Sequence, residues 1–282
     1  MRSKYKNRSY FKKYINLVQD KAILRTKKKL ALNDTGRGSI MSLKFSLCES
    51  YLKLIYLNYS IGNPIAPMKD YIKYAIDYIS DNGWISKENM TWKEDRKGDV
   101  EFLPEYWISA YYDLLKLLSF ATLFDLESVY FKKISNIIDN DGVKDHLLEY
   151  FLSQKIERTP IKKESYTKYF FIQESFSKLR EVAKSDDQEK SQDLLIKYLK
   201  KDWKKNFRDM GGNFKQHEKK FFLFKGYWSI EVAAMVKIKG IDDSPFRDHE
   251  YYPKDFLHQS TEDNEDKNKK GKSGFLSWFR KG

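Results

Sequence analysis

The segment MSLKFSLCESYLKLIYLNY, residues 41–59, is apolar almost all the way round a helical turn. A helix with no polar face is stable in water only when other elements enclose it. The segment therefore predicts a fold in which neighbouring helices surround a central one. It also holds Cys48, the single cysteine of the chain, which excludes an intrachain disulfide and indicates a buried small side chain.

The remaining apolar residues also recur mostly at helical spacing, and the 282-residue chain has only 13 glycines and 6 prolines. We find no strand-like alternation of useful length, and the polar segment 86–102 is predicted to be a loop. These patterns predict an all-α fold, a multi-helix bundle of two packed helical regions with no sizeable sheet. Helices are expected over residues 9–32, 39–61, 67–82, 104–125, 127–139, 143–155, 166–184, 188–208 and 214–239.

The polar, basic segment KIERTPIKKES, residues 155–165, is typical of a linker between two halves. We predict an N-terminal helical region over 1–125 and a C-terminal helical region over 126–258. Residues 259–282 are low in complexity and are predicted to form a disordered tail. The aromatic end of this tail, GFLSWFRKG, is expected to be frayed or weakly docked.

The formal net charge of +13 lies mostly at the N-terminus, since residues 1–50 hold 13 Lys and Arg against 3 Asp and Glu. This basic arm could contact phosphates or an acidic partner, although a solvated helix face explains the same residues. The N-terminus lacks the apolar core of a signal peptide, and the longest apolar run is too short and too charged to cross a bilayer. We expect a cytoplasmic protein with no membrane partner.

The sequence does not show the usual spacing of a catalytic, metal or cofactor site. In HEYYP the residue that should be the second histidine of a zinc motif is Pro253, and TGRGS lacks the lysine of a phosphate loop. Asp145, His146 and Glu149 lie close together, but a solvated helix surface explains them equally well. We therefore predict no catalytic residues, no metal and no cofactor.

The stretch 225–256 carries most of the remaining candidate residues. A helix over 214–239 with Gly240 just beyond its end would contain Glu231, for which Arg247, Tyr227 or a lysine could be the donor. Asp243 or Ser244 would cap a second helix beginning at Pro245. The candidates, either binding or fold-defining, are Tyr227, Trp228, Glu231, Asp242, Asp243, Asp248, His249, Tyr251 and Tyr252. A hydrolase using Glu231, Asp243 and His249 is a competing hypothesis.

The same stretch resembles the C-terminal signature of the PoNe-type immunity family. The resemblance rests on Gly-Tyr-Trp at 226–228, Glu231, the paired alanines 233–234, Ile-Asp-Asp at 241–243 and Tyr-Tyr-Pro at 251–253. YSIGNPIAPMKDYIKYAIDYI, residues 59–79, is similar to the N-terminal region of that family, and DLLIKYLKKDWKKNF also fits its place upstream of the signature. The resemblance covers about residues 5–258.

This resemblance implies a helical, non-enzymatic immunity protein that binds a cognate antibacterial toxin and blocks its active site. The toxin would be a DNase delivered between bacteria, as in type VI secretion. A basic inhibitor departs from the acidic face expected against a nuclease, so Asp242, Asp243, Asp248 and Glu250, or the tail, could supply local acidity. Nucleic-acid binding by the basic arm is the alternative hypothesis. The oligomeric state, a homodimer included, stays open.

Overall fold

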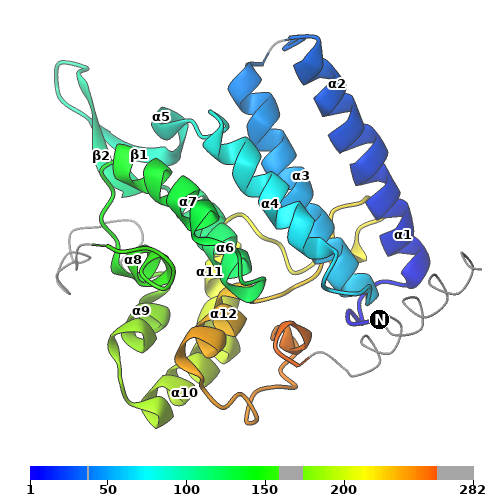
Figure 1. The fold of residues 1–282 in the computed structure, drawn as a ribbon, viewed down its shortest axis with the longest axis vertical. Helices are drawn as coiled ribbons and strands as arrows, with labels where there is room; N and C mark the ends of the chain where they lie inside the picture. The colour runs from blue at the N-terminus through cyan, green and yellow to red at the C-terminus, as the bar shows by residue number, and fades with distance from the viewer. Residues whose placement is uncertain (37, 159–173, 259–282) are drawn as a thin grey trace, which may run out of the picture.

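The computed structural model describes residues 1–36, 38–158 and 174–258. The predicted tail, most of the predicted linker and the first part of the helix expected over 166–184 lie outside the described residues. The all-α prediction is confirmed, with one small sheet added (Figure 1). The elements of the first half are α1 Arg8–Leu17, η1 Val18–Leu24, α2 Arg25–Ala31, α3 Ile40–Ile61, α4 Met68–Ser80, α5 Ser86–Asn89, β1 Met90–Glu94, β2 Val100–Tyr106, α6 Ile108–Leu123 and α7 Ser128–Asn140.

The second half is more irregular and places short helices around long connecting loops. Its elements are α8 His146–Leu152, α9 Ser177–Lys184, α10 Gln188–Lys197, η3 Tyr198–Asp202, α11 Trp203–Asp209, η4 Gln216–Glu218, α12 Ile230–Lys239 and η5 Lys254–Phe256. Helices α10, η3 and α11 follow one another without a break, as do α1, η1 and α2. Each run therefore forms the single long helix that the sequence predicts, with a π-helical stretch in its middle.

Helix α3 begins and ends as its sequence indicates. The Ser39 side chain accepts a hydrogen bond from the Ser42 backbone N–H, and Gly62 takes the left-handed conformation at the far end. Cys48 is buried, as expected for a small apolar residue. The buried residues of α3 lie on several sides of the helix, which confirms that it is enclosed by the rest of the fold.

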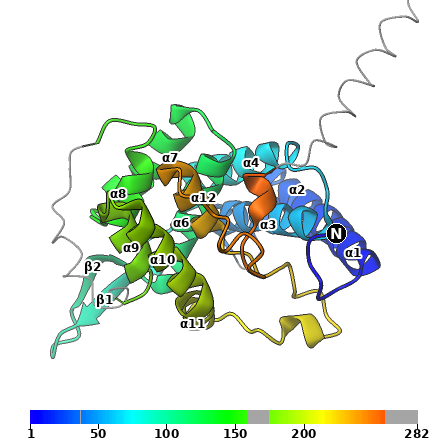
Figure 2. The ribbon, with the colours of Figure 1, turned by 90° about the horizontal axis from the view of Figure 1, so that it is seen from below.

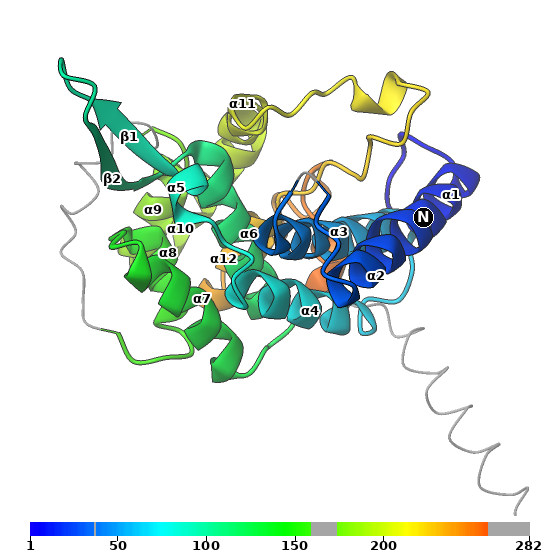
Figure 3. The same cartoon turned by 90° about the horizontal axis from the view of Figure 1, so that it is seen from above.

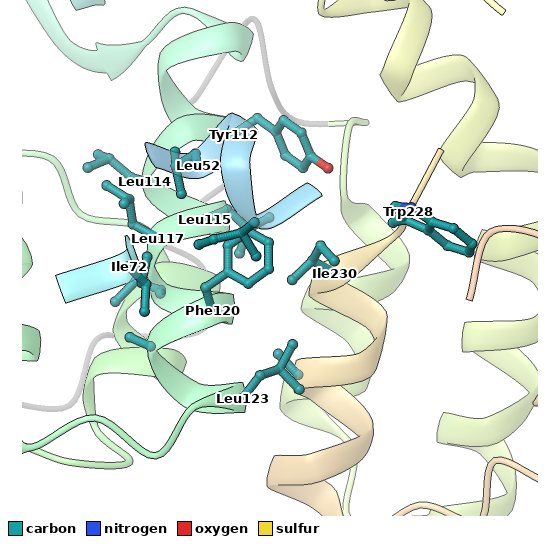
Figure 4. Packing of buried hydrophobic residues seen from close by; sticks show 14 of the residues in the cluster. Leu52, Ile72, Tyr112, Leu114, Leu115, Leu117, Phe120, Leu123, Trp228 and Ile230 are labelled. Carbon is teal, nitrogen blue, oxygen red and sulfur yellow. The ribbon is translucent and has the colours of Figure 1, made fainter. Parts of the chain in front are cut away.

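Helix α6 joins the two halves of the core. Twelve of its sixteen residues are buried. Ile72 of α4 lies on one side of α6 and Ile230 of α12 on the other (Figure 4). The hydroxyls of Ser119 and Thr122 donate to the carbonyls four residues earlier, so these two buried hydroxyls are satisfied within the helix.

The segment predicted to be a polar loop folds instead into a β-hairpin. Strands β1 and β2 pair antiparallel, with Trp92 opposite Phe102 and Glu94 opposite Val100. Pro104, which was expected to begin a helix, lies in β2, and the helix begins four residues later. The turn is closed by Asp95, whose carboxylate accepts from the backbone N–H groups of Lys97 and Asp99. The alternation of apolar and polar residues is only a few residues long on each strand, which is too short to indicate a strand from the sequence.

The prediction of one long helix over 214–239 is also wrong, because the α-helix covers only Ile230–Lys239. Residues 210–229 form an extended connection with a short 3-10 turn, and this connection crosses α1. The Tyr10 hydroxyl donates to the Phe224 carbonyl at 3.1 Å, and the Phe222 ring contacts Tyr10 and Tyr14. Aromatic packing against α1 therefore holds this segment extended where sequence spacing favoured a helix.

The N-terminus lies beside the C-terminal signature, although they are more than 200 residues apart (Figure 2). The backbone N–H groups of Arg2 and Ser3 donate to the Ser60 carbonyl at the end of α3. The Arg2 guanidinium forms an ion pair with Asp255 at 3.1 Å. Within the described ranges, no helix has the length and apolarity needed to cross a membrane.

The close approach of α3 to the signature depends on Gly226. Its φ is +120°, and a Cβ there would overlap the Trp228 indole nitrogen and the Ser60 hydroxyl. We expect Gly226→Ala to lower the free energy of unfolding by about 2–4 kcal/mol, from both overlap and backbone strain. Gly142→Ala is the control, because Gly142 also has a positive φ but open space around it, and it should cost about 1–2 kcal/mol. Equal losses in urea unfolding would contradict the overlap.

Candidate functional site

The nine candidate residues of the signature divide by exposure. Six are buried, which are Tyr227, Trp228, Glu231, Asp243, Tyr251 and Tyr252. Asp242 and Asp248 are exposed, and His249 is half-buried. Most of the signature therefore faces the interior, where its polar groups need partners.

Glu231 is fully buried and receives three hydrogen bonds. Ser229 donates from its hydroxyl at 2.8 Å, Tyr198 of η3 at 2.9 Å and Tyr112 of α6 at 3.4 Å. The prediction that Arg247, Tyr227 or a lysine donates to Glu231 is wrong, because two tyrosine hydroxyls and a neighbouring serine are the donors. Burial raises the pKa of Glu231, and the hydrogen bonds offset part of that rise. The carboxylate joins α12 to the two helices packed around it.

Asp243 is the second buried carboxylate of the signature. It accepts from Arg247 at 2.6 Å and 2.8 Å, from the Tyr252 hydroxyl at 2.8 Å and pairs with the His258 ring at 2.7 Å. Burial would raise its pKa, but the hydrogen bonds from Arg247 and its neighbours lower it overall. Asp243 therefore holds the segment 243–258 in a closed loop.

The capping role expected for Asp243 is wrong, because residues 244–248 form turns and no helix begins at Pro245. Asp242, rather than Asp243, stabilises the first of these turns. Its carboxylate accepts from the backbone N–H and the hydroxyl of Ser244. Asp248 lies in the same turns and forms an ion pair with Lys254 at 2.6 Å, with 87% of its side chain exposed.

The aromatic residues of the signature complete a continuous cluster. The Trp228 indole donates to the Ser60 hydroxyl at 2.8 Å and packs edge-on against Tyr59. Tyr251 stacks on Trp203 of α11, with ring centroids 4.5 Å apart. Tyr227 contacts rings from three separate segments, those of Tyr5, Phe207, Phe214 and Phe224. Such edge-to-face and stacked pairs stabilise a core beyond the area they bury.

The first residues of the chain, which the sequence indicated only as part of a basic arm, close over this cluster. The Tyr5 hydroxyl donates to Glu250 at 2.9 Å, and Lys4 forms an ion pair with the same carboxylate at 3.2 Å. Burial would raise the pKa of Glu250, but hydrogen bonds from Tyr251 and Tyr5 lower it to about 2. Glu250 is therefore charged and neutralised locally under ordinary conditions.

A surface pocket of about 460 Å³ lies between the N-terminal residues and the signature. Its walls are aromatic, and its rim carries charges of both signs. Five of the candidate residues line it, together with the first residues of the chain. These five are Tyr227, Trp228, Asp248, His249 and Tyr252. The mixed rim favours no single class of small ligand.

The hydrolase hypothesis requires Glu231, Asp243 and His249 to act on one substrate. Glu231 is enclosed by α6 and η3, and Asp243 is occupied by its own ring of donors. His249 lies on the wall of the pocket, where its ring nitrogen accepts from the Tyr251 backbone N–H. The three side chains are thus held by separate partners, and the geometry does not support shared chemistry.

The cluster around Asp145 is buried, so its interpretation as a solvated helix surface was wrong. Asp145 caps α8 by accepting from the Leu148 backbone N–H, and it also binds Tyr111 and Arg180. Glu149 is paired with Arg158. Across the part of the chain that the structure describes, no cluster of His, Cys, Asp and Glu has the geometry to hold a metal ion.

Glu231 gives a direct test of the signature's structural role. Glu231→Ala should lower the free energy of unfolding by about 2–4 kcal/mol, because three hydroxyls lose their acceptor. Glu231→Gln keeps an acceptor oxygen and should cost less. An acid whose pKa is raised by folding weakens the folded state as it ionises, so the wild type should lose stability relative to Glu231→Gln as pH rises above about 4.5. Urea unfolding across pH 4–8 measures both effects, and the opposite slope would contradict the assignment.

Comparison with known protein families agrees with the resemblance of residues 225–256 to a family signature. The model of the N-terminal region of PoNe immunity proteins matches residues 2–136, and the model of their C-terminal region matches residues 143–256. The gap between the two matches, residues 137–142, covers the end of α7 and the first residues after it. Searches of curated proteins and of solved structures gave no significant match. Two family models in the expected order span most of the sequence, and the chain belongs to the PoNe immunity protein family.

Proposed function

We propose that this protein binds a cognate antibacterial nuclease toxin and neutralises it by blocking its active site. The observation that supports the proposal is the match of both family models, one after the other, along the chain. The toxin is proposed to be a DNase delivered between bacteria. The immunity protein would act in the cytoplasm, where such a toxin meets its substrate.

Inhibition would be stoichiometric rather than catalytic. The carboxylates that first suggested chemistry, Glu231 and Asp243, are saturated by structural donors. The hydrogen bonds to these two carboxylates hold α12 and the loop 243–258 in place. A rigid, preorganised surface is what a tight protein inhibitor needs, because little conformational entropy is lost on binding.

The signature residues are proposed to divide between two roles. The six buried ones define the fold, since each is occupied by internal packing or hydrogen bonds. Asp242, Asp248 and His249 have accessible atoms and could contact a partner. We also propose that the chain divides into an N-terminal region over 1–125 and a C-terminal region over 126–258.

The mode of inhibition is tested with the cognate nuclease toxin, which is sought among the products of the neighbouring genes. Co-expression of the full chain should restore growth, and in vitro DNA cleavage should stop at equimolar amounts of the two proteins. Cleavage should return when the complex is dissociated and the toxin is recovered, because no bond is changed. Complete inhibition at a small fraction of an equivalent would instead indicate an enzyme. Absence of both protection and binding would overturn the proposed function.

Nucleic-acid binding by the N-terminal helix is a second candidate function. The run α1–η1–α2 carries eight Lys and Arg against one Asp, and in the described ranges none of the eight forms an ion pair. Lys21, Arg25 and Lys28 are exposed at i, i+4 and i+7, so they extend along one face. Unpaired cations in a row match the phosphates of a nucleic acid.

This second function predicts salt-dependent binding of duplex DNA by the full chain. The plot of log affinity against log salt concentration has a negative slope, and K21E/R25E/K28E should reduce the magnitude of that slope by about 3. K87E/K132E/K190E is the control, since these exposed lysines lie on α5, α7 and α10 and the net charge changes equally. Fluorescence anisotropy from low to physiological salt measures the slope. Equal losses in the two variants, or no binding at low salt, would exclude the helix as a DNA site.

A further inference from the structure

The hairpin β1–β2 stands apart from the helical body. Figures 1 and 3, taken at right angles, both show the paired strands extending away from the helices to a free tip. Its base is anchored, because Thr91, Glu105 and Tyr106 are buried and Tyr106 donates to Asp141 at 2.7 Å. Residues 92–102 are exposed. A two-stranded hairpin has little stability of its own, so the anchored base is what holds it out.

One face of this hairpin is apolar and uncovered. Trp92, Val100 and Phe102 remain 48%, 52% and 39% exposed. Trp92 is directly opposite Phe102 in the register, and Val100 is opposite Glu94, so all four side chains lie on the same face. The opposite face carries Lys93 and Glu101, which form an ion pair at 2.7 Å. The two faces therefore differ sharply, and the apolar one has the composition of a binding surface.

The hairpin also departs from the rest of the protein in charge. The exposed residues 92–102 hold four Asp and Glu against three Lys and Arg, a small acidic excess in a chain whose net charge is +13. Glu94 and Asp99 are exposed near the tip. The hairpin is thus a projecting, aromatic element with a small acidic excess on a basic protein.

We propose that the apolar face of this hairpin is the toxin-binding surface, and that it enters the substrate cleft of the nuclease. The inference rests on the proposed function. A cleft that binds nucleic acid is positively charged, so it repels the basic helix α1–η1–α2 and favours the hairpin, where the exposed Glu94 and Asp99 lie near the tip. Trp92 and Phe102 supply the buried aromatic anchors that dominate protein interfaces. Paired strands lie about 4.8 Å apart, so the ribbon is narrow enough to occupy a groove.

The proposal explains why nuclease inhibition is compatible with a basic protein. Only the local charge at the contact must complement the cleft, and the mostly buried signature need not touch the toxin. A second copy of this chain is the other occupant that the exposed face could take, and the experiment separates it from the toxin.

The test uses the full-length protein and a catalytically inactive form of the nuclease domain encoded beside its gene. W92A/F102A should weaken binding by about 100-fold, because both anchors are lost. E94K/D99K should weaken it by about tenfold and reduce the salt dependence of association. Asp95 is left unchanged, since its carboxylate closes the turn. A short DNA duplex should displace the wild-type protein, because both would occupy one cleft.

The controls separate a lost contact from a lost fold. E181K/D193K makes the same charge change on exposed residues of α9 and α10 and should leave affinity within about threefold of wild type. Each variant is checked by circular dichroism and thermal unfolding, and the exposed positions of Trp92 and Phe102 predict native helical content.

The possible outcomes are distinct. If the wild type binds and protects but W92A/F102A binds equally well, the hairpin assignment is overturned while the proposed function stands. If DNA and the immunity protein bind the nuclease together, insertion into the cleft is overturned. If the wild type forms a concentration-dependent dimer that W92A/F102A abolishes and the toxin does not compete, the face belongs to a second copy. If the wild type neither binds nor protects, the proposed function itself fails, and the hairpin proposal with it.

Discussion

Enclosure of helix α6 is the constraint on which the rest of the structure depends. The helix is buried on most of its circumference, and α4, α7, α8 and α12 all pack against it. Burial of these Leu, Phe and Tyr side chains is the main favourable term in folding. It also fixes the position of Tyr112, which reaches Glu231. The core and the signature are therefore set by the same helix.

The signature works as a set of internal connections. Glu231 ties α12 to α6 and η3, Asp243 closes the loop after α12, and Trp228 ties the start of the segment to α3. Buried carboxylates are tolerated because each is matched by several donors. A dense group of acids, tyrosines and a histidine looks like an active site in sequence, yet in this fold the same groups hold three segments together.

Separating structure from recognition in this way leaves the exposed elements free to vary in function. The pocket beneath the N-terminal residues, the basic helix and the hairpin lie on different parts of the surface. Of these, the hairpin combines uncovered aromatic residues with acidic charge. An inhibitor with a rigid core and a projecting recognition element can present that element without reorganising on binding.

The sequence by itself determined the helical class, the long helices over 8–31, 40–61 and 188–209, the left-handed residue at Gly240 and the family. The helices and the left-handed glycine follow from local periodicity, capping residues and glycine positions, which act within a few residues of one another, whereas the family follows from the motifs of the signature. The tertiary structure decided the hairpin, the extended segment 210–229 and the partners of Glu231. Those depend on contacts between residues far apart in the chain, such as Tyr10 with Phe224 and Tyr112 with Glu231, and no local pattern carries them. The exposed face of Trp92 and Phe102 became visible only once their strands were paired.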